Sequence, residues 1–379
     1  MKLDLADDWR NIKAAQLKQA AAKTLEQLDA ELEAMHIRGQ WKLGDAQFFD
    51  GPKPAGVPQV WKWSEVHPKL LESCTVMPES LTARRSLLFY NAGLNWRGTT
   101  QTLLAGMQAV RPGEIASAHR HSMAAVRFSV AGHPKLYTVV NGEPLAMETN
   151  DLILTPSYTW HDHHNDSDVD GIWLDVLDVP FSMGLNQPFF EAYGEEAQAR
   201  RSRGSDFALR RTGNLRPAWE QRVSQNFPYR YPWQEVVTAL DEFRDAEGSP
   251  YDGLALEYVN PATGGPTMPT LACYVSVLRP AFEGKRRRRT SSAVYYVIEG
   301  EGATLCGDQE MRWSPQDVFC VPNWIWHRHV NRSRRDRVVL FCVSDDPILS
   351  ATGLYREDPE NTLRAMPLPA LPPRPQKIT

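Results

Sequence analysis

Features of secreted, membrane and nucleic-acid-binding proteins are scarce in this sequence. Its five cysteines are odd in number and show no C-x-x-C spacing, and four lie in apolar, strand-like segments where thiols usually pack in a core. No apolar run approaches the length of a membrane span, and the charged N-terminus is unlike a signal peptide. The net charge is only −4, which gives no reason to expect a nucleic-acid partner. These features favour a reducing cytoplasm.

The 379 residues are enough for two domains with full cores. Residues 5–36 are rich in Ala, Leu, Gln, Lys and Glu with an approximate apolar stripe, which predicts a helix. Residues 41–78 alternate Trp and Pro with little periodicity, which predicts an extended arm. Because such a helix needs a partner surface, we expect it to cover the chain's own barrel or a neighbouring subunit.

From residue 86 onward, many short apolar runs separated by turn residues predict an all-β sandwich or barrel. Asn141-Gly142 between two such runs predicts a tight hairpin. The strand pattern stops near residue 182 and restarts at residue 271. Pro156-x₄-His161-x₃-Asn165 recurs as Pro322-x₄-His327-x₃-Asn331, so we expect two copies of one β-module in tandem.

Five of the ten histidines fall in two short runs, residues 113–121 and 156–165. On a strand, His119 and His121 point to the same face, and His161 could supply a third imidazole. Three neutral imidazoles suit Fe, Zn, Cu or Ni better than Mg or Ca. The alternative, a chance cluster on the surface, fits poorly with the apolar, β-patterned surroundings. His164 falls on the opposite face and is expected to be a packing or surface residue.

The two histidine runs resemble the paired motifs of the cupin superfamily. The matching pattern is Gly113-(five residues)-His119-x-His121, then Asn150-(five)-Pro156-x-Tyr158-x-x-His161-(three)-Asn165. Cupins usually carry Gly where Asn150 and Tyr158 stand here. Most metal cupins also carry a Glu shortly beyond the second His, where this chain has Ala125 and Val126. The resemblance therefore implies three neutral ligands and no carboxylate.

A two-cupin chain with three histidines, Arg127-Phe128 and the Trp160–His164 run resembles the gentisate and salicylate 1,2-dioxygenase family, which includes 5-nitrosalicylate and 1-hydroxy-2-naphthoate dioxygenases. The likeness implies an N-terminal helical extension followed by two double-stranded β-helix (jelly-roll) domains. The expected divisions are 1–80 (helix and arm), 81–182 (catalytic cupin), 183–255 (connecting segment), 256–350 (metal-free cupin) and 351–379 (Pro-rich tail).

The family resemblance also implies an activity. Members use Fe(II) and O2 to open an aromatic ring between a carboxyl-bearing and a hydroxyl-bearing carbon of a 2-hydroxybenzoate, such as gentisate, salicylate or 5-nitrosalicylate. The open alternatives are a 1-hydroxy-2-naphthoate dioxygenase, a zinc cupin isomerase and a non-catalytic ligand-binding bicupin. Zinc would fit the three histidines equally well, so iron rests on the resemblance. A homotetramer is also implied.

Two polar residues share the inward face of the ligand-bearing strands. Arg127 has the same parity as His119 and His121, so it should enter the barrel and meet either a substrate carboxylate or a buried acid. His163 has the parity of His161 and could act on the substrate's hydroxyl group or on oxygen.

Other substrate contacts are expected around the same cavity. Gly106 and Gln108 lie on the inward face of an adjacent strand, where the glycine leaves space for a ring. Leu104 stands where relatives often carry Trp. Arg84 matches an arginine that relatives use near the carboxylate, with Arg85 as the alternative.

In the second module, Arg287 and Arg289 hold the positions of the two motif histidines, and His327 alone remains. One imidazole is too few for a catalytic metal. We therefore predict a structural module and one metal per chain. The basic run Lys285–Arg289 is expected to form intersubunit ion pairs rather than a nucleic-acid patch, because no aromatic residues are interleaved with it.

Overall fold

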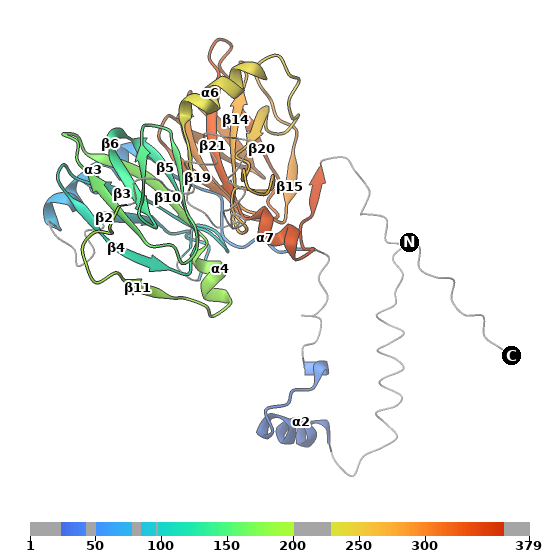
Figure 1. The fold of residues 1–379 in the computed structure, drawn as a ribbon. Helices are drawn as coiled ribbons and strands as arrows, with labels where there is room; N and C mark the ends of the chain where they lie inside the picture. The colour runs from blue at the N-terminus through green and yellow to red at the C-terminus, as the bar shows by residue number, and fades with distance from the viewer. Residues whose placement is uncertain (1–23, 43–50, 78–84, 96–97, 201–228, 360–379) are drawn as a thin grey trace. The chain divides into compact units, whose positions relative to one another are not determined.

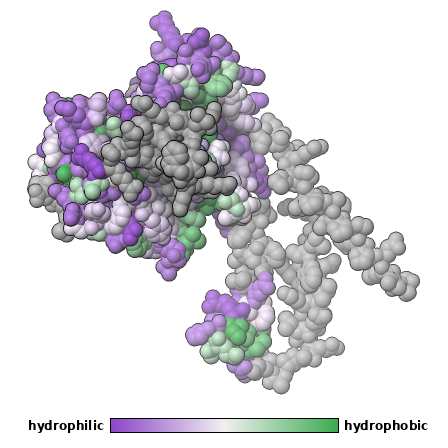
Figure 2. Space-filling model, in the orientation of Figure 1, coloured by the Kyte–Doolittle hydropathy of each residue, from purple (hydrophilic) through white to green (hydrophobic). Residues whose placement is uncertain are grey.

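The computed structural model describes residues 24–42, 51–77, 85–95, 98–200 and 229–359, and the chain divides into two units, 1–52 and 53–379 (Figure 1). In the smaller unit, α2 (Leu25–Ala34) begins with a capping box between Thr24 and Gln27. This confirms the last part of the expected helix, and residues 5–23 lie outside the described residues. No side chain of α2 is buried, and Figure 2 shows hydrophobic side chains on the surface of this unit.

The larger unit contains the two expected β-modules, and all of the strand pairings described in it are antiparallel (Figure 1). The first module has one sheet in the order β12-β8-β5-β10-β3-β2 and another in the order β11-β4-β9-β6-β7. A cluster of buried side chains from both sheets, including Val110, Leu136 and Trp173, fills its interior. Its strands are β2 (Arg85–Phe89), β3 (Leu104–Val110), β4 (Ile115–His121), β5 (Ala125–Ala131), β6 (His133–Val140), β7 (Glu143–Met147), β8 (Leu152–Thr155), β9 (His161–Asn165), β10 (Gly171–Leu177), β11 (Phe190–Ala192) and β12 (Tyr229–Tyr231).

The second module repeats this plan, with sheets in the orders β1-β19-β16-β21-β14-β13 and β18-β17-β20-β15-β22. Its interior is more aromatic, because Tyr295 and Trp313 both stack on Phe319 within it. Its strands are β1 (Gln59–Trp61), β13 (Leu254–Glu257), β14 (Ala272–Leu278), β15 (Arg287–Arg289), β16 (Ala293–Glu299), β17 (Gly302–Cys306), β18 (Gln309–Trp313), β19 (Val318–Val321), β20 (His327–Val330), β21 (Val338–Ser344) and β22 (Glu357–Pro359). The expected all-β bicupin architecture is thus confirmed.

Each module lends a strand to the other. The expected arm contributes β1, which pairs with β19 of the second module, before α3 (Trp63–Val76) packs on β2 and β3 of the first. The expected connecting segment contributes β12, which pairs with β8 of the first module, before α6 (Trp233–Glu242). A buried carboxylate fixes each crossing, since Asp317 accepts the Trp63 N–H and Asp151 accepts the Trp233 N–H, both at 2.8 Å. The structural repeat therefore begins before the strands that carry the repeated sequence motif, because each module is preceded by a short strand and a helix of the same kind.

Two short helices end the modules, and none of the described helices is long and apolar enough to cross a membrane. They are α4 (Val179–Gly184) after β10 and α7 (Asp346–Ala351) after β21.

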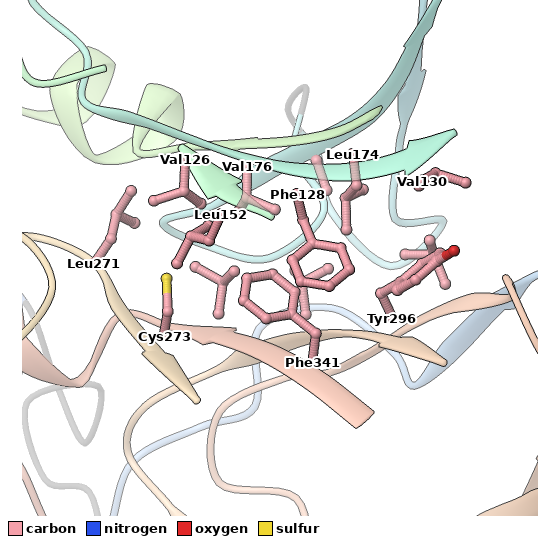
Figure 3. Packing of buried hydrophobic residues seen from close by; sticks show 14 of the residues in the cluster. Val126, Phe128, Val130, Leu152, Leu174, Val176, Leu271, Cys273, Tyr296 and Phe341 are labelled. Atoms are coloured by element: carbon pink, nitrogen blue, oxygen red, sulfur yellow. The ribbon is translucent and has the colours of Figure 1, made fainter. Parts of the chain in front are cut away.

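One apolar cluster joins the two modules. Phe128 of β5 stacks on Phe341 of β21 with ring centroids 4.1 Å apart, and Val126 and Val130 extend the contact (Figure 3). Because side chains alternate along a strand, the intervening residues of β5 point into the first barrel. Arg127 is one of these residues, as its parity predicts.

Candidate active site

The structure brings together the three histidines that the sequence singles out. His119 and His121 lie on β4 and His161 begins β9, with each side chain at most 5% exposed. Their candidate ligand nitrogens all lie within 4.8 Å of one another. Among the residues that the structure describes, no other set of three or more His, Cys, Asp or Glu side chains is so placed.

An irregularity in β4 produces this arrangement. Ala116 lies opposite His163, and a regular antiparallel ladder would then place residue 118 opposite His161. Instead the register shifts between Ala116 and His119, so that His119 lies opposite His161. The extra residue places both imidazoles on the barrel side of the pair.

Backbone carbonyl groups orient all three rings. The Nδ1 atoms of His119 and His121 lie 2.8 Å from the carbonyl oxygens of Ser117 and Met123, and His161 Nδ1 lies 3.0 Å from that of Thr159. A carbonyl oxygen only accepts, so in the neutral rings Nδ1 carries the proton and Nε2 carries the lone pair.

The triad has the properties of a transition-metal site. Burial, followed by the positive potential of His119 and Arg127, holds the pKa of His161 well below its usual value, so this ring is neutral. Its Nε2 is buried and has no hydrogen-bond partner among the described residues, which is costly unless another partner is supplied. Three neutral nitrogen donors fit an Fe, Zn, Cu or Ni ion.

Arg127 lies beside this centre and is held by a buried acid. Its Nε is 3.1 Å from Asp175 Oδ1, and it also donates a hydrogen bond to Thr155. Burial lowers the pKa of Arg127, and the Asp175 carboxylate opposes that shift. Trp173 Nε1 donates to Asp175 Oδ2 at 3.0 Å and fixes the carboxylate. Strand parity left two expected partners for Arg127, a substrate carboxylate or a buried acid, and the buried acid is present as Asp175.

His163 lies deeper in the barrel and is 1% exposed. Its Nδ1 is 2.8 Å from Thr138 Oγ1, and its ring lies 5.0 Å from that of Trp173 and 5.9 Å from that of His161. His164 takes the opposite face as expected, where its Nε2 is 2.6 Å from Asp162 Oδ1.

The residues expected on the neighbouring strand also face the barrel. Leu104, Gly106 and Gln108 alternate with β3 residues that lie in the apolar cluster between the modules, and Gly106 lies opposite Asp175. A Cβ at Gly106 would lie 2.8 Å from the Leu87 carbonyl oxygen. The glycine is thus required by the close approach of β2, whether or not a ring lies beside it.

Arg84 and Arg85 were the two candidates for an arginine near the substrate carboxylate. Arg84 lies outside the described residues. Arg85 is buried and forms a two-pronged ion pair with Glu114, with distances of 2.5 and 2.7 Å, and donates to the Met77 carbonyl oxygen. Those contacts give Arg85 a structural role in linking β2 to the start of β4.

Sequence reasoning missed the contribution of the segment after α4. Phe190 of β11 lies opposite His121 and stacks on the His119 ring at 5.3 Å. Glu191 pairs with Arg120, which also lies 4.5 Å above the Trp160 ring. The segment carries no motif, so only its pairing with β4 reveals it.

The second module confirms the expected correspondence of positions. Arg287 lies opposite His327 as His119 lies opposite His161. The basic run forms ion pairs within the chain, Arg287 with Asp252 and Arg288 with Asp358, where intersubunit pairs were expected. The expectation that His327 alone remains missed His329. His329 corresponds to His163, and its Nδ1 lies 2.9 Å from the hydroxyl oxygen of a threonine, Thr304, as that of His163 lies near Thr138. The repeated His-x-His spacing was the available signal.

Comparisons with known proteins agree with this architecture. Residues 106–177 and 274–344 each match the cupin domain family. The 1-hydroxy-2-naphthoate 1,2-dioxygenase of Nocardioides sp. (strain KP7) is 45% identical over 357 residues, covering 93% of this chain and 92% of that protein. The 5-aminosalicylate 1,2-dioxygenase of Comamonas sp. is 38% identical over 88% of this chain and 90% of its own length. The solved salicylate 1,2-dioxygenase of Pseudaminobacter salicylatoxidans superposes with a TM-score of 0.78 at 34% identity, covering 90% of this chain and 99% of that one.

Proposed function

Since this chain belongs to the cupin family of ring-cleaving gentisate and salicylate 1,2-dioxygenases, we propose that its substrate is a 2-hydroxybenzoate. The chain is an oxidoreductase, and the proposed cleavage lies between the carboxyl-bearing and hydroxyl-bearing carbons. The observation that carries the proposal is the buried triad of His119, His121 and His161, with Arg127 and His163 on the same inward face.

We propose Fe(II) as the metal, held by the Nε2 atoms of the three histidines. Bound there, it would supply the redox chemistry that lets O2 react with an aromatic ring. With no carboxylate in the triad, the site keeps its positive charge and favours an anionic hydroxy-carboxylate. The three protein ligands leave room for further ligands, as in other catalytic metal sites.

Arg127 is proposed to bind the substrate carboxylate. Asp175 and Thr155 hold the guanidinium in place, so little conformational entropy is lost when the substrate pairs with it. Arg127 is 4% exposed, and such burial strengthens a charge-assisted bond.

His163 is proposed to accept the proton of the substrate's hydroxyl group. Thr138 Oγ1 lies 2.8 Å from His163 Nδ1 and 3.1 Å from the Met147 sulfur, so its hydroxyl group can accept from His163 Nδ1–H while it donates to the sulfur. That tautomer leaves the lone pair of His163 on Nε2, the atom that would take the proton.

A second candidate substrate is 1-hydroxy-2-naphthoate, favoured by the 45% identity to the Nocardioides enzyme. It presents the same neighbouring hydroxyl and carboxylate groups on a larger ring. Leu104 is proposed to contact that ring, together with Gly106 and Gln108. The named relatives are all dioxygenases, so a zinc isomerase or a non-catalytic bicupin has no support.

Oxygen uptake with a panel of aromatic acids tests the proposal. Gentisate, salicylate, 5-nitrosalicylate and 1-hydroxy-2-naphthoate are supplied to the Fe(II)-loaded protein, with benzoate and phenol as controls that each lack one of the two groups. We expect one O2 consumed per molecule of at least one hydroxy-carboxylate and none with either control. No uptake with any panel member would overturn the proposal.

We also propose a cytoplasmic location for the enzyme. All five cysteines are free and buried, as expected for thiols that pack in a core under reducing conditions.

A further inference from the structure

In the second module, six buried side-chain polar atoms have no hydrogen-bond partner among the described residues. Two are Tyr258 Oη and Asp346 Oδ1, and the other four lie on β15, on β20 and just after β15. These four are Arg289 Nε, Ser291 Oγ, His327 Nε2 and His329 Nε2. An unmet buried polar group destabilises the fold, so four together are not a neutral feature of a core. They call for a ligand that the protein itself does not supply.

Three of these atoms, on Arg289, His327 and His329, lie at the place in the second barrel that matches the metal site of the first, and Ser291 follows Arg289 by two residues in the chain. Arg287 lies opposite His327, and Arg289 follows two residues later, on the same face of β15. The rings of His327 and His329 are 5.8 Å apart, and both interact electrostatically with the two arginines. The replacement of two neutral imidazoles by two guanidinium groups changes a cation site into a candidate anion site.

One positive charge in this cluster lacks an ion-pair partner. Arg287 is held by Asp252, with oxygens at 2.5 and 2.6 Å, and Glu357 is 3.5 Å away. Arg289 has no carboxylate at ion-pair distance within the described part of the chain, and its guanidinium remains protonated at any physiological pH. Burial lowers the pKa of His329 to about 4 and that of His327 well below its usual value, so both rings are neutral. The cluster as a whole holds two arginines and two carboxylates, so the charge available to a ligand is that of Arg289 alone.

The donor and acceptor pattern narrows the ligand further. His327 Nδ1 lies 2.9 Å from the Ile325 carbonyl oxygen and must carry the proton, so His327 Nε2 is an acceptor. Arg289 Nε–H is a donor, and Ser291 can donate its hydroxyl hydrogen. A carboxylate would satisfy these two donors, whereas the His327 acceptor requires a hydroxyl group on the same molecule.

Aromatic side chains limit the size of the ligand. Tyr295 lies opposite Cys342, as Arg127 lies opposite Asp175 in the first module, and Tyr274 takes the place of Gly106 on the next strand. Tyr295 belongs to the buried core of this barrel, and Tyr274 packs against that core. The space that would hold a substrate ring in the first module is filled here.

We propose that the second module binds a small aliphatic hydroxycarboxylate monoanion, with its carboxylate on Arg289 and Ser291 and its hydroxyl group on His327. This binding site is separate from the three-histidine centre and needs no metal. The second module is then a ligand-binding domain, where the sequence indicated a purely structural one.

Calorimetric titration of the full chain without bound metal, so that the three-histidine centre cannot chelate the probe, tests this proposal with glycolate and with acetate as the matched probe without a hydroxyl group. Arg289→Leu removes the unpaired cation. Arg288→Leu is the control, because it removes the same charge one residue away, where the guanidinium pairs with Asp358 and lies over Trp324. We expect Arg289→Leu to weaken glycolate binding at least tenfold and Arg288→Leu to leave it unchanged, since hydrogen bonds to charged groups contribute about 1.5–3 kcal/mol.

The hydroxyl contact has its own test. Wild-type protein should bind glycolate about 2- to 10-fold more tightly than acetate at this binding site, which is the range for one neutral hydrogen bond. His327→Phe should abolish that preference while acetate still binds. Equal glycolate affinity in wild type, Arg289→Leu and Arg288→Leu would overturn the proposal.

A measurement on the wild-type protein covers the case in which Arg289→Leu does not fold. Crystals soaked in glycolate should show the anion within hydrogen-bond distance of Arg289 Nε. Ordered water alone between Arg289 and His327 would overturn the proposal.

Discussion

Three backbone carbonyl groups decide which nitrogen of each site histidine can reach a metal. Those of Ser117, Met123 and Thr159 take the Nδ1 protons, which leaves the Nε2 lone pairs, and the candidate ligand nitrogens of the three rings lie within 4.8 Å of one another. The identity of the histidines could be predicted from sequence, because strand parity and spacing are local properties. The tautomer could not, because it depends on backbone geometry that the sequence does not display.

For Arg127, too, the direction of the side chain could be predicted from nearby residues, whereas its ion-pair partner could not. Its inward direction followed from parity with His119 and His121. Its partner Asp175 lies on β10, which pairs with β5 but is separated from it by four strands of sequence. No short-range sequence pattern predicts that contact.

The substrate role of Arg127 can be separated from its ion pair. Arg127→Leu alone leaves the Asp175 carboxylate buried and unpaired, which should destabilise the fold by about 3–5 kcal/mol. Adding Asp175→Asn should restore most of that stability while keeping an acceptor for Trp173 Nε1. We expect turnover to stay about 10- to 100-fold low in the double variant, because the charge-assisted bond to the substrate is still lost. Thermal unfolding and steady-state kinetics measure both effects, and recovery of turnover in the double variant would make Arg127 a structural residue only.

His163 and His161 should separate catalysis from metal binding. His163→Ala is expected to retain iron and lose about 10²- to 10⁴-fold in turnover, the range for a general base. His161→Ala is expected to lose iron. Thr138→Val, which removes the hydroxyl group beside His163 Nδ1, should retain iron and lose less turnover than His163→Ala. Metal analysis beside kinetics checks these outcomes, and an iron-free His163→Ala with an iron-loaded His161→Ala would invert the assignment.

At the scale of strands and turns, the hairpin between β6 and β7 was the easiest element to predict. Asn141 and Gly142 have φ of 49° and 83°, as a two-residue turn with both residues left-handed requires. Tyr158 also has a positive φ of 63°, although cupins usually have glycine there. Its N–H donates to the His121 carbonyl oxygen at 2.7 Å, a contact that offsets some of the strain of about 1–2 kcal/mol. The exchange of β1 and β12 between the modules could not be predicted from the sequence. Each strand has three residues, which is too short for an alternation of apolar and polar residues to be recognised.

Asp345, just before α7, links a loop of the first module to the second and should make stability depend on pH. It accepts hydrogen bonds from the Thr102 hydroxyl group and from the Ser292 N–H at 2.7 Å. Burial nevertheless raises the pKa of Asp345 to about 6 from its ordinary 3.8. A raised pKa means that the folded state binds the proton more tightly, so this group's contribution to stability is complete below about pH 4 and is lost as pH rises through about 6.

The measurement is the stability of wild type relative to Asp345→Asn across that pH range. Wild type should lose up to about 3 kcal/mol relative to the variant between pH 4 and pH 7, the equivalent of two pKa units. Asp308→Asn at an exposed position is the control and should show no such trend. A difference between wild type and Asp345→Asn that stays constant with pH would contradict the assignment.

At the scale of the whole molecule, two modules share one apolar cluster, but within the residues that the structure describes only the first has a histidine triad. The tandem repeat and the loss of the second motif could be predicted, because each motif is a short string with fixed spacing. The packing of the modules through Phe128 and Phe341 could not, because the outward faces of the two sheets are as apolar as their inward faces.

The smaller unit gives a prediction about assembly. Leu25 and Leu28 of α2 are 45% and 36% exposed, and Ile37 and Trp41 nearby are 48% and 47% exposed. We propose that a neighbouring subunit covers them in a homotetramer, as the family resemblance implies. Light scattering should give four times the chain mass of 42.9 kDa. Leu25→Glu with Leu28→Glu should reduce that mass, and a wild-type monomer at micromolar concentration would contradict the proposal.

The central claim is that one three-histidine iron site per chain performs the ring cleavage. It is tested most directly by adding Fe(II) stepwise to metal-free protein and measuring the rate of substrate-dependent O2 uptake after each addition. The account predicts a rate that rises linearly and stops rising at one equivalent per chain, with no rise in His161→Ala. A break at two equivalents, or uptake that survives in His161→Ala, would contradict it.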